Sequence, residues 1–354
     1  MRIAIEKLIH GGNGMGESEG KKILVPCSAP GDILEVEIAA DHGSWAEGAV
    51  ASVVEPAPCR VLPPCPVFGE CGGCQWQHIS YPAQLEWKKR ILIETLDRVG
   101  KISSPNVLEA LPSPKEWHYR NRIQLHVDSR GKVGFYRARS KDVVEFKECA
   151  IADERLNAEL NSRREDISRR DKGIALRVKD DGVSFAQINS GQNEQLKKML
   201  VEWLREVPHK TVFELYAGAG NFTFAYAGIA ERVVASDIDG RAIRAAKEAQ
   251  EKLGARNIEF VCAPEARAAR RLLGDCDAVL VDPPRKGCAE VLEAVAGLNP
   301  RSIFYISCDP ATLARDALAL SELGFSLVRS LPVDMFPQTF HIESLSLFAP
   351  RPTA

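Results

Sequence analysis

Cys308 is the first residue whose type and position could carry chemistry. It follows an apolar, β-branched run over residues 302–306, and Pro310 stops that run from continuing. Such a run is typical of a buried strand in a parallel sheet. The carboxyl ends of strands in open α/β sheets face the ligand crevice, so this thiol is either a nucleophile or a packing residue. Free cysteine is among the most buried residue types, and the position taken alone favours packing.

A second group of residues indicates a nucleotide or nucleoside cofactor. Gly218 and Gly220 follow a predicted strand over residues 211–216, and Asp237 closes the next predicted strand. Glycines permit close backbone approach to a ligand, and the acid can accept hydrogen bonds from ribose hydroxyls. The pattern therefore predicts a binding loop at the carboxyl edge of a sheet.

The residues around this loop narrow the choice of cofactor. Thr223 stands where the dinucleotide fingerprint has a third glycine, which disfavours a turn that cradles a pyrophosphate. Asn221 and Phe222 suit a cofactor without that group, such as S-adenosylmethionine. Asp282, followed by two prolines, places a carboxylate at the tip of another strand beside the crevice. These features favour a methyltransferase over a dehydrogenase or a non-catalytic remnant.

The cysteines near residue 70 have the spacing of a metal site. Cys65, Cys71 and Cys74 form a C-x5-C-x2-C pattern, with two glycines that let the loop fold back tightly. The fourth ligand has three candidates, which are Cys59, His78 and the distant Cys149. Thiolates suit either zinc or an iron–sulfur cluster.

A basic and aromatic segment follows between residues 117 and 149, where strands are predicted over 123–127 and 133–136. Basic side chains interleaved with aromatic ones suit phosphate contact and base stacking. The set comprises Arg120, Arg122, Arg137, Arg139 and Lys141, with Tyr119, Phe135 and Tyr136. The alternative interpretation of this segment is a solvated surface with no role in binding.

The elements that must position these residues fall into three predicted domains. Residues 1–56 have the short strands of a small five-stranded β-barrel, with residues 11–16 as a turn-rich loop, and serve either as a structural cap or as an oligonucleotide-binding module. Residues 57–180 form a β-rich central domain, in which the cysteine segment is followed by a helix near residues 81–99. Residues 181–354 alternate strands and helices as a Rossmann-like α/β domain and end in an antiparallel hairpin at the sheet edge.

Composition limits the class of protein. The chain has 354 residues, of which 45% are hydrophobic and 27% charged, with a net charge of −2 and ten cysteines. These values indicate a globular protein with no broadly basic surface, although local basic patches can still bind nucleic acid. Without a signal-peptide pattern or a membrane-spanning run, we expect a cytoplasmic protein that has no membrane partner and no disulfides.

Over nearly its whole length the chain resembles the RNA 5-methyluridine methyltransferases, which are class I enzymes dependent on S-adenosylmethionine. The resemblance implies that residues 1–56 are a TRAM domain, an RNA-binding barrel. It also implies that Cys65, Cys71, Cys74 and Cys149 hold a [4Fe–4S] cluster, which leaves Cys59 outside the set.

The resemblance further implies the catalytic and donor-binding residues. Ser307–Pro310 match the nucleophile motif, with Cys308 as nucleophile, and residues 336–343 match the segment that carries the catalytic base, Glu343. The residues implied to bind the methyl donor are Gln187, Tyr216, Gly218, Gly220, Asn221, Asp237 and Asp282. Asp237 replaces the more usual glutamate and shortens the reach to the ribose.

The expected function is methylation of carbon 5 of a specific uridine in RNA. The expected substrate is 23S ribosomal RNA, the alternative is the T-loop uridine of transfer RNA, and the enzyme is expected to be a monomer. Amino-group methylation is disfavoured because Arg285 stands where such enzymes have an aromatic residue after the paired prolines. The alternative from another class is a non-catalytic RNA-binding protein with a metal clip.

Overall fold

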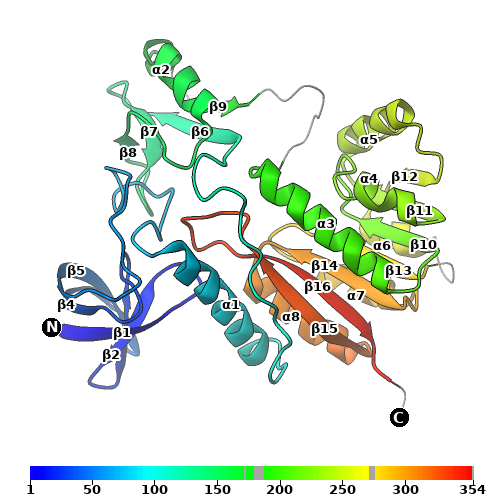
Figure 1. Ribbon diagram of the computed structural model, residues 1–354, viewed down its shortest axis with the longest axis horizontal. Coiled ribbons are helices and arrows are strands. Elements are labelled where there is room, and N and C mark those ends of the chain that lie inside the picture. The colour runs from blue at the N-terminus through cyan, green and yellow to red at the C-terminus, as the bar shows by residue number, and fades with distance from the viewer. Residues whose placement is uncertain (171–172, 179–186, 271–275, 353–354) are drawn as a thin grey trace.

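The computed structural model describes residues 1–170, 173–178, 187–270 and 276–352. Within these residues the chain forms a closed barrel, a four-stranded sheet and a seven-stranded sheet, which occupy separate regions of Figure 1. None of the described helices is both long enough and apolar enough to cross a membrane. The expected division into domains at residues 56 and 180 stays a prediction.

The N-terminal residues form the closed five-stranded barrel that the sequence predicts, in the order β1-β2-β3-β5-β4. Its strands are β1 (Arg2–Leu8), β2 (Gly14–Ser18), β3 (Lys21–Val25), β4 (Ile33–Asp41) and β5 (Trp45–Glu55). Alternate side chains such as Ile3, Ile5 and Leu34 fill its core.

One expectation for the barrel is wrong, because residues 14–16 are not a loop but belong to β2. A Cβ atom on Gly14 would lie 2.2 Å from the Ser28 hydroxyl oxygen, and one on Gly16 would lie 2.3 Å from the Ala4 carbonyl oxygen. The two glycines therefore permit close packing within a strand. Composition alone could not separate this role from a turn.

A four-stranded sheet follows the long helix α1 (Tyr81–Arg98), in the order β8-β7-β6-β9. Its strands are β6 (Arg122–Val127), β7 (Val133–Tyr136), β8 (Val143–Glu145) and β9 (Ile174–Arg177). Helix α2 (Glu154–Ser168) covers one face through Leu156, Leu160 and Ile167. The opposite face of β6 carries Arg122 and Gln124, which are exposed.

The seven-stranded sheet has the order β12-β11-β10-β13-β14-β16-β15. Its strands are β10 (Thr211–Leu215), β11 (Arg232–Asp237), β12 (Ile258–Cys262), β13 (Ala278–Val281), β14 (Ser302–Ser307), β15 (Phe325–Val333) and β16 (Glu343–Pro350). Strands β10 to β14 pair in parallel, and β16 runs antiparallel to both β14 and β15. The expected antiparallel hairpin at the edge is confirmed.

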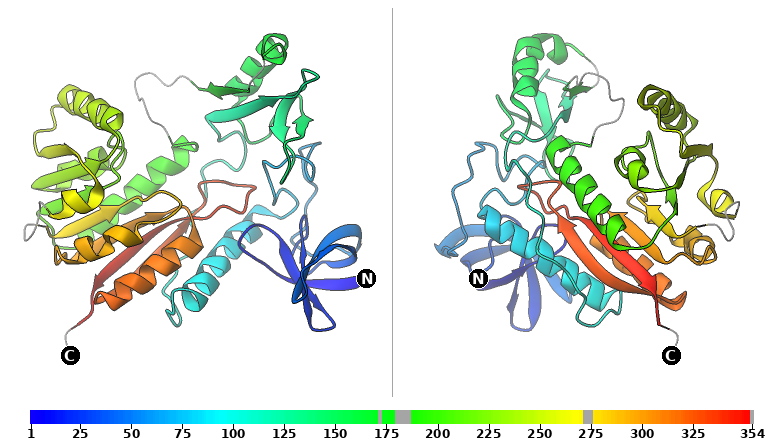
Figure 2. Two further views of the ribbon diagram at one scale, coloured as in Figure 1. Left: turned by 180° about the vertical axis from the view of Figure 1, so that it is seen from behind. Right: turned by 45° about the vertical axis from the view of Figure 1, so that its right-hand side comes forward.

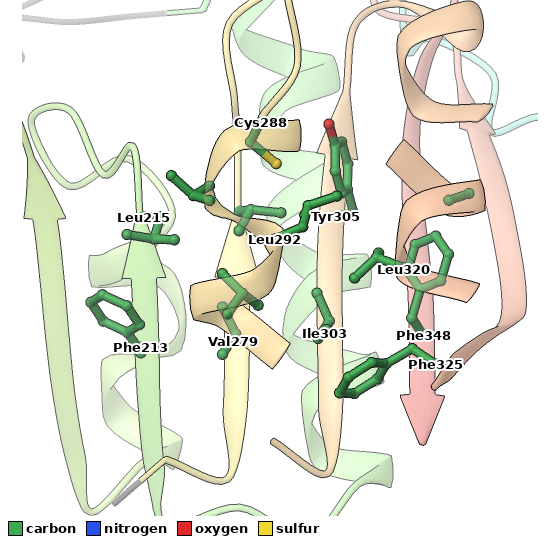
Figure 3. Packing of buried hydrophobic residues seen from close by; sticks show 14 of the residues in the cluster. Phe213, Leu215, Val279, Cys288, Leu292, Ile303, Tyr305, Leu320, Phe325 and Phe348 are labelled. Carbon is green, nitrogen blue, oxygen red and sulfur yellow. The ribbon is translucent and has the colours of Figure 1, made fainter. Parts of the chain in front are cut away.

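Helices cover both faces of this sheet. They are α3 (Ser190–Glu206), α4 (Thr223–Tyr226), α5 (Gly240–Leu253), α6 (Glu265–Arg270), α7 (Leu292–Ala296) and α8 (Pro310–Glu322). Figure 3 shows one of the two cores, in which Leu292 and Leu320 pack on Val279, Ile303 and Phe348 of the strands.

Helix α1 joins the same face as α8, although it lies far away in the sequence. It contacts both α8 and β15 (Figure 2) and adds Leu92 and Leu96 to the core. Helix α1 therefore connects the N-terminal part of the chain rigidly to the edge of the seven-stranded sheet.

Candidate active site

The register of two strands brings Cys308 and Glu343 together. Strands β14 and β16 are antiparallel, and their last pair at this end joins Ser307 to Ser344. Cys308 and Glu343 are the next residues on either strand, so they lie opposite one another. Cys308 is half-buried, unlike the fully buried Cys288, so packing does not account for its position.

The backbone after Cys308 turns directly into helix α8. The Asp309 carboxylate accepts a hydrogen bond from the Thr312 amide at 2.9 Å and caps the helix. The strand end, the thiol and the helix start therefore lie within the four residues 307–310, and the helix cap and Pro310 fix the direction in which the chain leaves the sheet.

Burial raises the pKa of three groups on this edge of the sheet, the Cys308 thiol and the carboxyl groups of Glu343 and Asp282. It raises the pKa of Cys308 to about 11, with the Glu343 charge raising it further and Arg285 lowering it. Burial and the charge of Asp282 raise the pKa of Glu343 to about 8, against the lowering effect of Arg285. Burial raises the pKa of Asp282 to about 7. The site therefore pairs a protonated thiol with a carboxyl group that titrates close to neutral pH.

The predicted donor loop has the backbone of a ligand cradle. Tyr216, Gly218 and Gly220 all have positive φ angles, of 62°, 54° and 87°. A Cβ atom on Gly218 would meet nothing within 4 Å, whereas one on Gly220 would lie 2.5 Å from the Phe224 ring. The loop is therefore packed against the Phe224 ring at Gly220, and the space beside Gly218 is empty.

Asp237 lies beside this loop at the end of β11. One carboxylate oxygen accepts the Gly218 amide and the other accepts the Asp239 amide, both at 2.8 Å. Each oxygen keeps a free lone pair, because a carboxylate can accept about four hydrogen bonds. Asp282 lies at the tip of β13, on the other side of β10 from β11, and its amide approaches the Leu215 carbonyl at 3.5 Å.

The remaining predicted donor residues, Asn221 and Gln187, lie near the N-terminus of α3. Asn221 and Asn193 exchange two side-chain hydrogen bonds, at 2.9 and 3.0 Å, which tie the loop to that helix. Gln187 precedes the helix, is half-buried, and accepts the Asn121 side-chain amide through its main-chain carbonyl at 2.7 Å. Phe185 and Ala186 of the expected F-x-Q-x-N segment lie outside the described residues.

Glu214 is a site residue that the sequence analysis did not assign. It is 1% exposed, and it accepts hydrogen bonds from the Thr223 hydroxyl at 2.6 Å and the Tyr226 hydroxyl at 2.7 Å. Burial raises its pKa to about 8. Glu214 therefore joins β10 to α4 beneath the loop, and the available signal was an acidic residue inside an apolar strand.

A barrel loop also reaches the site, which the sequence did not indicate. The His10 ring nitrogen Nε2 lies 3.7 Å from the Asp309 carboxylate, next to Cys308. The His10 ring also meets the Phe340 ring edge-on, with the centroids 6.1 Å apart. The barrel therefore borders the edge of the sheet that carries the thiol.

Four cysteines line a small pocket between the segment 65–77 and the four-stranded sheet. They are Cys65, Cys71, Cys74 and Cys149, whereas Cys59 and His78 do not line it. Burial raises the pKa of Cys71 to about 11 and of Cys74 to about 12. Across the described chain, no three histidine, cysteine or acidic side chains are grouped so that they could hold a metal ion. The thiols share a pocket without converging on a single point.

The basic and aromatic residues divide into buried and accessible ones. Tyr119 is 6% exposed and offers no stacking surface, whereas Phe135 is half-buried against Phe146 and lines the pocket described below. Tyr136 is 37% exposed and stacks on His126 with the ring centroids 3.7 Å apart. An open pocket beside this ring pair is lined by basic residues, namely Arg120, Arg137, Arg139 and Lys141.

Comparison with known proteins identifies relatives across the chain. Residues 154–350 match the family model described as tRNA (uracil-5-)-methyltransferase. An uncharacterized RNA methyltransferase of Bdellovibrio bacteriovorus is 35% identical over 98% of this chain and 94% of its own. The 23S rRNA (uracil(1939)-C(5))-methyltransferase RlmD of Shewanella amazonensis is 30% identical over 98% of this chain and 95% of its own.

A solved structure matches the whole fold. It is the Pyrococcus abyssi tRNA (uracil-54, C5)-methyltransferase in complex with S-adenosyl-L-homocysteine, which is 25% identical with a TM-score of 0.73. The match covers 99% of this chain and 100% of that one.

Proposed function

The chain belongs to the tRNA (uracil-5-)-methyltransferase family, and from that premise we propose that it methylates carbon 5 of a uridine with Cys308 as nucleophile and Glu343 as base. The observation that carries this assignment is the register of β14 and β16, which puts the two residues opposite each other. RNA uracil-C5 methylation is the activity of the family; the residue roles are our proposal.

The reaction needs both groups. Carbon 5 of uracil is a weak nucleophile, and attack of the Cys308 thiolate on carbon 6 converts it into an enolate carbon that can accept a methyl cation equivalent. Covalent catalysis thereby splits one difficult step into easier ones. Glu343 then removes the proton from carbon 5, and the electron pair of that bond re-forms the 5,6 double bond and expels the thiolate.

The electrostatics of the site set the cost of forming the thiolate. The pKa of Cys308, about 11, leaves the thiol protonated near neutral pH. Arg285 lowers the pKa of both Cys308 and Glu343, so its positive charge favours the ionised form of each group. We assign to Arg285 the role of stabilising these two charges during the reaction.

S-adenosylmethionine supplies the electrophilic methyl group when bound. The residues that would hold it are Gln187, Tyr216, Gly218, Gly220, Asn221, Asp237 and Asp282. The open space at Gly218 and the free lone pairs of Asp237 fit such a ligand. Ile238 follows Asp237 and is 63% exposed, which suits packing against an adenine ring.

We propose that Cys65, Cys71, Cys74 and Cys149 hold a [4Fe–4S] cluster. The four thiols line one pocket and provide the all-cysteine ligand set that such a cluster uses, a set that zinc also accepts. The cluster would join the segment 65–74 to Cys149 and so shape the surface around Arg120. Iron and sulfide analysis of anaerobically purified protein separates a cluster from zinc.

We propose 23S ribosomal RNA as the substrate, with the T-loop uridine of transfer RNA as the second candidate. The Shewanella relative is named for the first substrate and the Pyrococcus structure for the second. The barrel would be a TRAM-like RNA-binding domain, since its loop at His10 borders the thiol. We also place the enzyme in the cytoplasm as a monomer.

Mass-spectrometric mapping of 5-methyluridine tests this assignment. RNAs from a strain that lacks the protein are compared with RNAs from its parent. Loss of one 5-methyluridine in 23S rRNA supports the assignment, and loss in transfer RNA selects the second candidate. Unchanged 5-methyluridine in both RNAs would contradict the proposed function.

A further inference from the structure

The segment 334–342, which joins β15 to the strand that begins with Glu343, is held by side chains from distant parts of the chain. Four consecutive carbonyl groups in it accept hydrogen bonds from outside the segment. The donors are the Asn189 side chain to Met335 at 3.3 Å, Lys88 to Phe336 at 3.1 Å, Tyr119 to Pro337 at 3.0 Å, and the main-chain amides of Gln75 and Trp76 to Gln338 at 3.1 and 3.0 Å. We call these contacts the clamp.

A pair of buried glutamines lies at the centre of the clamp. The main-chain amide of Gln338 donates to the Gln84 side-chain oxygen at 3.0 Å. In return, the Gln84 side-chain nitrogen donates to the Gln338 side-chain oxygen at 2.9 Å. Gln84 also donates to the carbonyls of Trp76 and Ile79. Both glutamines are almost fully buried, at 0% and 2% exposure.

Gln338 has a backbone conformation that needs such support. Its φ angle is +68°, in the left-handed region that residues other than glycine rarely occupy. Backbone strain of this kind persists only where the surroundings over-determine it, and it clusters at functional sites. At the start of the same segment, Asp334 forms an ion pair with Lys88, and both side chains are at most 1% exposed.

The Glu343 carboxylate depends on this segment for its position. Among the described residues no side chain or amide hydrogen-bonds that carboxylate, so its place is set by the backbone on either side. On one side Glu343 continues into strand β16. On the other side it follows the clamped segment, and Gln338 lies five residues before it. Cys74 directly precedes Gln75, whose main-chain amide donates to the Gln338 carbonyl, so the cysteine segment contacts the chain five residues before Glu343.

We propose that Gln84 and Gln338 are positioning residues for Glu343, and that through them the cysteine segment 65–74 sets the geometry of the base. The inference rests on the proposed function, in which Glu343 acts only after the methyl group has been transferred. Disturbing the clamp therefore slows one step, the release of the methylated RNA from Cys308. Simple loss of folded protein would lower the amount of covalent complex formed without changing the rate at which that complex decays.

The test is a single-turnover reaction of Gln84→Met with uridine RNA and S-adenosylmethionine. Methionine has a similar length but removes all the amide contacts. The covalent protein–RNA complex is followed on denaturing gels. We expect it to form within about twofold of the wild-type rate and to decay on the order of tenfold to a hundredfold more slowly, the cost of misplacing a catalytic group by about 1 Å. Decay at the wild-type rate would overturn the proposal.

Two further variants make the result independent of folding. Gln338→Asn keeps a residue that tolerates the left-handed conformation but shortens its side chain, and we expect the same slow decay. Gln250→Met is the matched control, because Gln250 also donates to two carbonyls but lies on α5, outside the clamp. It should decay as the wild type does. The decay rate concerns only complex already formed, so it does not depend on the folded fraction.

A separate measurement tests whether the cysteine segment 65–74 affects the segment before Glu343. Hydrogen exchange is measured on peptides that cover residues 334–343 in the wild-type holoprotein and in Cys74→Ser. Faster exchange in the variant, together with slow decay of the covalent complex, supports the connection, and unchanged exchange contradicts it. A wild type that forms neither covalent complex nor 5-methyluridine would instead contradict the proposed function itself.

Discussion

Cys308 and Glu343 illustrate how burial and neighbouring charge set the chemistry of single residues. Both lie at the carboxyl edge of the sheet, and burial favours the neutral form of each. A carboxyl group with a pKa of about 8 is a much stronger base than an exposed glutamate, whose pKa is about 4.3. The same burial makes the thiolate costly to form, so the positive charge of Arg285 gains importance.

Glu343→Gln should separate the two halves of the reaction. The amide cannot accept the carbon-5 proton, but it leaves Cys308 free to attack. We expect methylated RNA to stay covalently bound to the protein, with its release slowed on the order of 10²-fold or more. Denaturing gels with radiolabelled methyl donor measure the complex. Normal multiple turnover by this variant would show that Glu343 is not the base.

Arg285→Met should move the pH dependence of covalent attack to more alkaline values. Arg285 lowers the pKa of Cys308 and Glu343, so its loss raises both, and less of each group is ionised at a given pH. The side chain is exposed, and solvent screening limits the expected slowing near pH 7.5 to a few-fold. The measurement is adduct formation with 5-fluorouridine RNA between pH 6.5 and 9.5.

The matched control for Arg285 is Lys286→Met. Lys286 is the next residue, is also exposed, and pairs with Glu290 rather than with the site. It should leave the pH profile unchanged. An equal shift in both variants would mean that general surface charge, rather than Arg285, sets the profile.

Motifs in the sequence marked Cys308, Gly218 and Gly220, and the family resemblance added Glu343. How these residues lie relative to one another was not predictable from any local pattern. Cys308 and Glu343 are 35 positions apart in the sequence, and only the register of β14 on β16 shows that they face each other. Glu214 and His10 escaped assignment because their contacts come from packing between elements, which no local pattern encodes.

At the scale of elements, the exposed aromatic surface of the four-stranded sheet is smaller than the sequence suggested. Only Tyr136 of the three aromatic candidates is exposed, and its ring is supported by His126. The neighbouring pocket is lined by basic side chains, which suit phosphate contact. This surface is our prediction for RNA contact outside the methylated uridine.

Tyr136→Ala should weaken RNA binding without changing the covalent step. Stacking of one base on an aromatic ring is worth about 1–3 kcal/mol, so the dissociation constant should rise on the order of tenfold. Filter binding measures affinity, and adduct formation at saturating RNA measures chemistry. Leu253→Ala removes another exposed apolar side chain, on α5, and should change neither. Unchanged affinity in Tyr136→Ala would exclude this surface.

Elements were predicted well where periodicity was strong. The barrel, strands β6 and β7, the alternating C-terminal sheet and its antiparallel edge all follow from residue patterns. The loop expected over residues 11–16 was wrong in part, because Gly14 and Gly16 are strand residues that allow close packing. The burial of Tyr119, whose hydroxyl donates to the Pro337 carbonyl, depends on residues far along the chain.

At the scale of the whole molecule, the barrel, the cysteine segment, α1 and the seven-stranded sheet meet at the segment before Glu343. The Trp76 indole donates to the Gly12 carbonyl of the barrel at 2.9 Å, and the Gln84–Gln338 pair continues the connection into the sheet. The edge of the sheet that carries Cys308 and Glu343 is therefore built by parts of all three predicted domains.

The buried acid Glu214 should make stability depend on pH. Its pKa of about 8 in the folded protein exceeds the value near 4.5 in an unfolded chain, so the folded state keeps a proton that the unfolded state loses. The free energy of unfolding therefore falls as pH rises from about 4.5 to 8, by up to about 1.4 kcal/mol per pH unit. Glu214→Gln should remove this contribution.

Urea unfolding at several pH values between 5 and 8 measures that effect. We expect a shallower pH dependence in Glu214→Gln than in the wild type, whatever the constant cost of the buried amide. Lys210 pairs with the exposed Glu231 at a distance from this site, and Glu231→Gln serves as the control that should keep the wild-type slope. Equal slopes for Glu214→Gln and the wild type would contradict the raised pKa.

The central claim is that Cys308 attacks carbon 6 of a uridine in RNA, and one measurement tests it most directly. When fluorine replaces the hydrogen on carbon 5, no proton is left there for a base to remove. RNA with 5-fluorouridine at the target position should therefore trap the methylated adduct. Wild-type enzyme with S-adenosylmethionine should form a denaturation-resistant complex whose mass maps to the peptide that contains Cys308, and Cys308→Ala should form none. Methylation of uridine RNA by Cys308→Ala at the wild-type rate would contradict the account.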